Sequence, residues 1–162
     1  MTVKPLYRAR RDYYRAMTTT SETSTARADG RLRTLGIATF GALLLQLLVG
    51  ISTTFWVELP EGGDAQSRMK DATNGGILMA HITIGTVLAV LAIILVIIAI
   101  RQKNRTWTTA SIVGLIGIFV SYFAGSAFLN PPENDSLSFA MTLGLAISIG
   151  AYVYGLAARP RN

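Results

Sequence analysis

Four long runs of apolar residues divide the chain, and none of them contains Asp, Glu, Lys or Arg. They cover residues 34–57, 77–100, 107–129 and 136–158, about 23 to 24 residues each. A helix rises 1.5 Å per residue and needs about 20 residues to cross the hydrocarbon core of a bilayer. The runs lack the alternation of barrel strands, and backbone in lipid must satisfy its own hydrogen bonds. The predicted fold class is therefore an all-α membrane protein, a four-transmembrane-helix bundle.

The polar segments between the runs differ in charge and predict an orientation. Thirteen of the 15 basic residues lie before the first run, between the second and third, or after the fourth. The connections at 58–76 and 130–135 carry most of the acidic residues. Under the positive-inside rule, both termini are cytoplasmic and these two connections face outward. We therefore expect a multi-pass protein of a bacterial cell (inner or plasma) membrane, with residues 159–162 as a cytoplasmic tail.

Composition narrows the chemistry. Hydrophobic residues make up 51% of the chain and charged residues 15%, against about a quarter charged in soluble domains. There is no cysteine and one histidine, so disulfides, thiolate metal sites and a multi-histidine zinc centre within one copy are excluded. The net charge of +6 follows the predicted membrane orientation. It indicates contact with anionic lipid, and no nucleic-acid partner is expected.

Residues 1–33 form a basic N-terminal arm and linker ahead of the bundle at 34–158. Between Lys4 and Met17, arginines alternate with tyrosines, and Thr18–Thr25 is rich in Ser and Thr, which is typical of a flexible linker. Three interpretations stay open for the arm. It is a solvated or lipid-touching tail, a segment that docks on a partner's cytoplasmic face, or a nucleic-acid-binding segment.

The single histidine, His81, lies about one turn into the second run. Gly85, Ala89 and Ala92 follow it at four- and three-residue steps, so one helix face is narrow there. The face suits either a neighbouring helix, to which His81 hydrogen bonds, or a haem b whose iron the imidazole ligates. Proton or quinone chemistry is a third alternative. Met141, or His81 of a second copy, would supply the second iron ligand; Met141 as plain packing is the alternative.

Polar and small residues in the other runs predict helix packing. Gln46 lies near the middle of the first run and should face the bundle, for an interhelical bond or a ligand contact. Small residues repeat along the third and fourth runs, including Gly117, Ser121, Gly125, Gly144 and Ser148. These stripes predict close pairing of the last two helices or docking on a foreign helix.

Four aromatic residues lie near the ends of the runs. Trp56, Trp107, Tyr152 and Tyr154 occupy positions where amphipathic rings favour the membrane interface. The sequence therefore predicts that they anchor the span ends.

A family resemblance rests on short motifs in the first two runs. The segment LQLLVG at 45–50, and the segment GILMAH at 76–81 followed by Gly85, resemble haem A synthase. That family has eight helices in two four-helix halves, each with an LQ…G helix followed by a helix that carries a haem- or substrate-associated histidine. The resemblance implies that His81 matches a haem-ligand histidine and Gln46 the helix-packing glutamine. The chain is half the family's length, has one histidine where a half-module needs two, and lacks the family's outer acidic residue and loop cysteines. Haem A synthesis by this chain alone is therefore not expected.

The prediction of function rests mainly on chemical groups that are missing from the apolar runs. No buried carboxylate, lysine or nucleophile–base pair lies in the runs. We expect a non-catalytic integral membrane subunit, accessory to a larger respiratory or energy-converting complex, whose partners are other membrane subunits or a second copy. The alternative is a b-type haem protein that uses His81. An enzyme that modifies haem or lipid is a third class.

Overall fold

Helices account for every regular element in the part of the chain that the structure describes. This computed structural model covers the backbone of residues 4–130 and 135–158 and the side chains of 30–130 and 135–158. The elements are α1 (Lys4–Trp56), α2 (Ala65–Asp71), α3 (Gly75–Arg101), α4 (Arg105–Phe128) and α5 (Asp135–Ala157). Residues 131–134 of the second outer connection and the predicted tail at 159–162 lie outside the described residues.

Four of these helices match the predicted membrane spans. Gly30–Trp56 within α1, and the whole of α3, α4 and α5, are long and apolar enough to cross a bilayer. The predicted all-α fold with four membrane-spanning helices is confirmed. The short α2, which lies in the connection between the first two spans, was not predicted.

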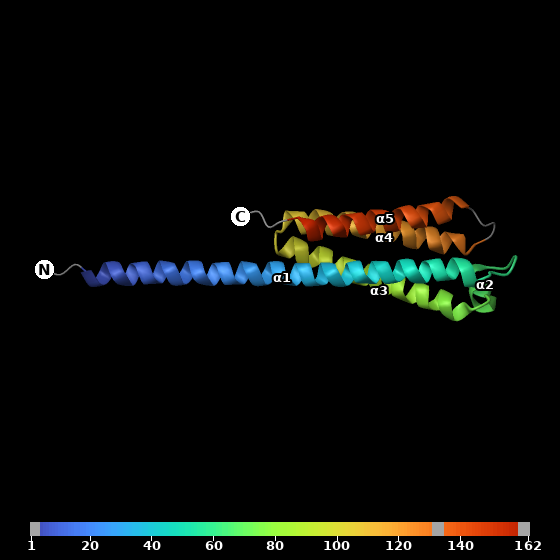
Figure 1. Ribbon diagram of the computed structural model, residues 1–162, viewed down its shortest axis with the longest axis horizontal. Coiled ribbons are helices and arrows are strands. Elements are labelled where there is room, and N and C mark those ends of the chain that lie inside the picture. Colours follow the sequence, from blue (N-terminus) through green and yellow to red (C-terminus); the bar gives the residue numbers. More distant parts are fainter. Residues whose placement is uncertain (1–3, 131–134, 159–162) are drawn as a thin grey trace.

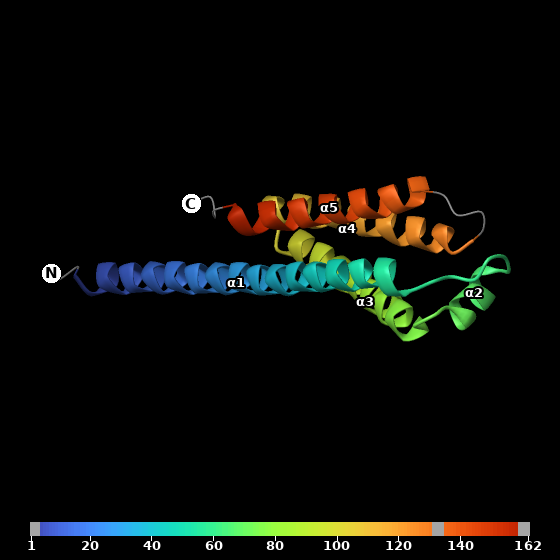
Figure 2. The same ribbon diagram turned by 45° about the vertical axis from the view of Figure 1, so that its right-hand side comes forward.

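The four long helices pack as two unequal pairs. α4 and α5 lie side by side and form the most extensive contact, while α1 packs against α3 and α5, and α3 also against α4 (Figure 1). Figure 2 shows α3 crossing α1 at an angle, so that its N-terminal end diverges from α4. The main cluster of buried residues comes from all four helices: Leu32, Leu43, Leu88, Ala92, Leu95, Ala99, Trp107, Ile118 and Tyr152. Most of them lie in the half of the bundle nearest the α3–α4 connection, so the packing is tightest there.

The ends of the helices separate the polar segments into two groups. The start of α4 and the end of α5 lie at the end of the bundle from which α1 emerges toward the N-terminus (Figure 1). The connection with α2 lies at the opposite end. The basic segments near Arg101–Arg105 and the acidic residues between Glu58 and Asp71 therefore lie at opposite ends of the bundle.

The N-terminal arm departs from the predicted organisation. α1 is one continuous helix of 53 residues, and it runs through Thr18–Thr25, where a flexible linker was expected. The 26 residues from Lys4 to Asp29 precede the span at Gly30–Trp56, and we call them the α1 extension. At 1.5 Å per residue, the extension is about 40 Å long. Figures 1 and 2 both show it running straight out of the bundle, away from every other helix.

Candidate functional site

The two polar residues predicted to face the bundle from α1 and α3 contact each other. The side-chain amide nitrogen Nε2 of Gln46 lies 3.1 Å from Nε2 of His81 and 3.2 Å from its Nδ1. In this arrangement, the amide N–H donates to whichever ring nitrogen carries the lone pair. With the amide turned over, its oxygen would instead accept from the ring N–H. Either way, the two side chains link α1 to α3 inside the predicted membrane.

Each of these two side chains lies against a glycine of the opposite helix. A Cβ added to Gly85 would lie 3.2 Å from Gln46 Nε2, and one added to Gly50 would lie 3.0 Å from His81 Cε1. Gln46 and Gly50 are four residues apart on α1, and His81 and Gly85 are four residues apart on α3. Because residues at this spacing share a helix face, the contact is reciprocal. The narrow face of α3 therefore packs against α1, so a neighbouring helix covers it.

One polar atom of this contact has no partner. Gln46 Oε1 is buried and makes no hydrogen bond among the described residues. Moving an amide oxygen from water into an apolar environment without a hydrogen-bond partner costs free energy. The pair is thus a link between helices that leaves one acceptor unsatisfied.

The small residues of α4 and α5 pack against each other. A Cβ on Gly117 would overlap the carbonyl oxygen of Gly144 and Oγ of Ser148, and a Cβ on Gly144 would lie 2.5 Å from the Gly117 carbonyl oxygen. Only glycine at both positions lets the two backbones approach this closely. Ser121 Oγ donates to the Met141 carbonyl at 2.7 Å. The stripes are therefore occupied by the pairing of the last two helices rather than left free for a foreign helix.

Ser148 forms a second link between α4 and α5. Its hydroxyl lies 2.9 Å from the Gly114 carbonyl across the helix contact and 2.9 Å from the Gly144 carbonyl in its own helix. Ser148 is fully buried, so both contacts are shielded from water. The hydroxyl proton can serve only one of these acceptors at a time.

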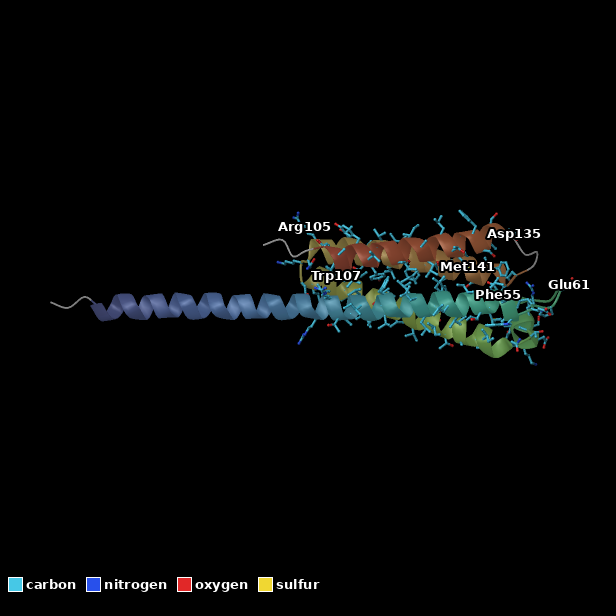
Figure 3. The ribbon with its side chains drawn as sticks, viewed as in Figure 1. Phe55, Glu61, Arg105, Trp107, Asp135 and Met141 are labelled. Atoms are coloured by element: carbon cyan, nitrogen blue, oxygen red, sulfur yellow. The ribbon has the colours of Figure 1, made fainter. Side chains whose placement is uncertain are left out.

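Met141 is not brought to His81. Its Sδ would lie 3.1 Å from a Cβ on Gly125, so Met141 packs against α4, whereas the contacts of His81 are with α1. α3 does not pack extensively against α5. Figure 3 shows Met141 toward the end of the bundle that carries Glu61 and Asp135. The two residues therefore do not form an axial pair within one copy.

The residues around His81 do not fit a haem in this arrangement. Both ring nitrogens lie within hydrogen-bond distance of Gln46, and the surfaces at Gly50 and Gly85 are covered by side chains of the facing helix. An axial ligand needs one ring nitrogen directed at an open space large enough for the macrocycle. Among the described residues, no group of three or more His, Cys, Asp or Glu side chains could hold a metal ion. The described contacts of His81 therefore leave its ring nitrogens no open space for a haem iron.

Two of the four predicted interface aromatics are buried instead. Trp107 is 7% exposed and lies between Gly36 of α1 and Gly155 of α5, where an added Cβ would contact its indole ring. Tyr152 is fully buried, with its ring against Gly114. Trp56 and Tyr154 are more than half exposed, as an interface position requires. The prediction was wrong for Trp107 and Tyr152 because glycines on neighbouring helices make room for their rings.

Arg68 on α2 is a structural residue that sequence reasoning counted only as a charge. It is 2% exposed, and its guanidinium donates from Nε to the Pro60 carbonyl and from Nη1 to the Leu129 carbonyl, both at 3.0 Å. Leu129 follows the last residue of α4, where carbonyl groups lack partners within the helix. Arg68 therefore ties the connection between α1 and α3 to the end of α4.

Asp64 is the N-cap residue of α2. Asp64 Oδ1 accepts a hydrogen bond from the Ser67 backbone N–H at 2.8 Å, the usual contact of an N-cap residue. This hydrogen bond lowers the pKa of Asp64 because it stabilises the charged carboxylate. An aspartate directly before a short polar run was the signal that could have predicted α2.

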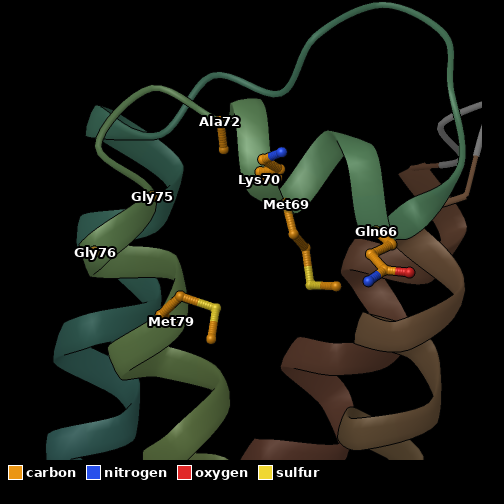
Figure 4. A pocket seen from close by; sticks show the side chains of 7 residues that line it. All are labelled: Gln66, Met69, Lys70, Ala72, Gly75, Gly76 and Met79. Carbon is orange, nitrogen blue, oxygen red and sulfur yellow. The ribbon is translucent and has the colours of Figure 1, made fainter.

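A shallow hollow lies beside α2 at the same end of the bundle. It has a volume of about 470 Å³ and is lined by Gln66, Met69, Lys70, Ala72, Gly75, Gly76 and Met79 (Figure 4). Lys70 is exposed, and the hollow opens widely to the surroundings. It has neither the enclosure nor the convergent polar groups that a small-molecule site requires.

Comparisons with protein-family models, with curated proteins and with solved structures found no match. The fold and the contacts within the bundle define the class: a multi-pass helical membrane protein in which a few polar side chains of the described spans, among them Gln46, Ser121 and Ser148, join helices.

Proposed function

We propose that this protein is a non-catalytic integral membrane subunit, accessory to a larger membrane complex. The observation that carries the proposal is the continuous α1, which leaves the bundle and runs about 40 Å beyond it. A polar helix with no neighbouring helix is marginal in water unless it bridges to another body. The α1 extension therefore suits contact with a partner outside the membrane.

The contacts inside the bundle support a structural role. Gln46 pairs with His81, while Ser121 and Ser148 bond to carbonyl groups across the α4–α5 contact. These hydrogen bonds join neighbouring helices and stabilise the bundle. A respiratory or other energy-converting complex is the setting we propose, in keeping with the resemblance of the first two spans to haem A synthase.

The proposed orientation places both termini in the cytoplasm of a bacterium. Eleven of the 15 basic residues support it, because they belong to described segments at the end of the bundle from which the α1 extension emerges. In this orientation α2 and the acidic connection face outward.

The proposal is tested by the size of the assembly in native membranes. After solubilisation in a mild detergent, we expect the full chain to migrate in native electrophoresis with other membrane proteins, well above the size of its own micelle. Migration as a monomer or a dimer of this chain alone, with no other protein, would contradict the accessory role.

The haem alternative is tested on the same preparation. A reduced-minus-oxidised spectrum of the wild type is compared with that of His81→Ala. A Soret band that disappears in the variant would replace the accessory proposal with a b-type haem protein. A band that survives would show that the iron has another ligand.

A further inference from the structure

We infer that the α1 extension, residues Lys4–Asp29, docks on an acidic surface of a partner protein. The inference rests on the proposed function and specifies the chemistry of the partner. The helix is long, runs straight away from the bundle and carries a net positive charge.

The geometry separates the basic residues from the lipid surface. α1 continues straight from its span into the extension, and Arg15 lies 15 residues before the first residue of that span, Gly30. That spacing corresponds to about 22 Å along the helix. The attraction of anionic headgroups falls off within a Debye length, about 8 Å at physiological ionic strength. Lipid headgroups therefore do not neutralise the arginines near the N-terminus.

The spacing of the basic residues in the α1 extension favours a negatively charged partner surface. Positions 4, 8, 11 and 15 are all basic, and their four- and three-residue steps place them on one face of the helix. Like charges at such spacings destabilise an isolated helix. The Ser- and Thr-rich stretch at 18–25 adds residues of low helix propensity. An acidic surface along this face would turn the repulsion into attraction.

The net charge of the α1 extension also favours an acidic partner protein over a second copy of this chain. The extension holds six basic residues and three acidic ones. Two parallel copies would therefore bring like charge together, whereas a carboxylate-rich protein surface is complementary. Tyr7, Tyr13 and Tyr14 alternate with the arginines, and Tyr and Arg are the residue types enriched in protein interfaces. Together with the distance of the arginines from the lipid surface, this composition favours a protein surface over a membrane surface.

Zero-length crosslinking tests the contact directly. Arg11→Lys and Arg15→Lys keep the charge and add an amine, and a carbodiimide joins an amine to a carboxylate only where the two touch. We expect these variants, in native membranes, to form adducts that mass spectrometry maps to Asp or Glu of a different protein. Ala16→Lys is the matched control, because it adds an amine one residue away but about 100° around the helix; it should give far fewer adducts.

Charge reversal supplies the second measurement. The variant with Arg8→Glu, Arg11→Glu and Arg15→Glu should retain its partner roughly tenfold less well than wild type at physiological ionic strength, and added salt should release the wild-type partner. The lysine variants should retain it.

Each other outcome overturns the inference in a recognisable way. Adducts only to carboxylates of the same chain would identify a second copy, and partner release by ribonuclease would identify a nucleic acid. If a spin label at Tyr14→Cys becomes oxygen-accessible in vesicles containing phosphatidylglycerol but not in phosphatidylcholine alone, the occupant is lipid. An intact complex without adducts at Arg11→Lys or Arg15→Lys overturns the inference and leaves the accessory role standing. The absence of any complex overturns both.

Discussion

The amide nitrogen of Gln46 lies within 3.2 Å of both ring nitrogens of His81, and this is the contact that joins the side chains of α1 and α3 across the predicted membrane. His81 belongs to the N-terminal part of α3, which diverges from α4 (Figure 2). The link therefore holds that part of α3 to α1.

Removing either partner should destabilise the bundle modestly. We expect Gln46→Leu or His81→Leu to lower the free energy of unfolding in mixed detergent micelles by about 0.6 kcal/mol, and at most about 1.7 kcal/mol, the range of hydrogen bonds between membrane helices. Reversible unfolding with increasing dodecyl sulfate measures the change. In the double variant, the two losses should be less than additive, because either single change already removes the contact.

A lipid-facing residue on the same helix provides the control. Leu48 is 63% exposed and two residues from Gln46, so Leu48→Ala should change the stability little. Strict additivity of the Gln46→Leu and His81→Leu effects would show that the two side chains do not interact.

The α4–α5 contact should be the least tolerant of added volume. Gly117→Leu would place a side chain where the Gly144 carbonyl and Ser148 hydroxyl lie, so the helices must separate. We expect a loss of about 1–3 kcal/mol in the same unfolding measurement, the usual range for overpacking. Gly150 on α5 has nothing within 4 Å of an added Cβ, so Gly150→Ala is the matched control and should be neutral. Equal tolerance at both positions would mean that α4 and α5 do not approach as described.

The spans could be predicted from the sequence because the thickness of the bilayer fixes how many apolar residues a helix needs. Helix contacts could be predicted only in part. The glycine and serine repeat at Gly117, Ser121, Gly144 and Ser148 pointed to α4–α5 pairing, because small residues permit close backbones. The sequence left open which helix covers His81. Counting residues from the helix ends places Gln46 and His81 at different depths, although the two are in contact. Gln46 lies ten residues before the end of α1 and His81 six after the start of α3, so the two ends lie at different depths.

Other features needed the tertiary structure. Trp107 looked like an interface anchor because its position near a span end is typical of one. Its burial depends on Gly36 and Gly155, which are distant in sequence. The same holds for Arg68, whose acceptors at Pro60 and Leu129 lie in separate connections. Propensity and charge counting describe residues one at a time, and these contacts arise only when helices from different parts of the chain meet.

The cap of α2 should depend on pH. The pKa of Asp64 is lower in the folded protein than in the unfolded chain, because the carboxylate accepts the Ser67 N–H. Its contribution is therefore fully present above the unfolded value of about 3.8. It is lost as the pH falls through the lower folded value. Hydrogen exchange at the Ser67 amide should accelerate, relative to the intrinsic rate, over that acidic interval.

Two variants separate the charge of Asp64 from its capping hydrogen bond. Asp64→Asn keeps an acceptor and should remove the acid transition, whereas Asp64→Ala should expose the Ser67 amide at every pH. An unchanged pH profile in Asp64→Asn would assign the transition to another group.

Arg68 should hold the connection between α1 and α3 against the end of α4. Arg68→Ala removes the donors to the Pro60 and Leu129 carbonyls, and the loss of these part-buried hydrogen bonds costs at most about 3 kcal/mol. Because the lost contacts tie one segment to another, we expect the effect locally, as faster proteolysis of the connection between Glu58 and Asn74 in reconstituted vesicles. Arg68→Lys should restore only part of the protection, since a single ammonium cannot reproduce the spread of donors on a guanidinium. Lys70 is exposed on the same short helix, and Lys70→Ala changes the net charge equally. If Lys70→Ala accelerates proteolysis as much as Arg68→Ala does, the protection comes from charge alone, and the assignment of Arg68 as the tie between α2 and α4 is wrong.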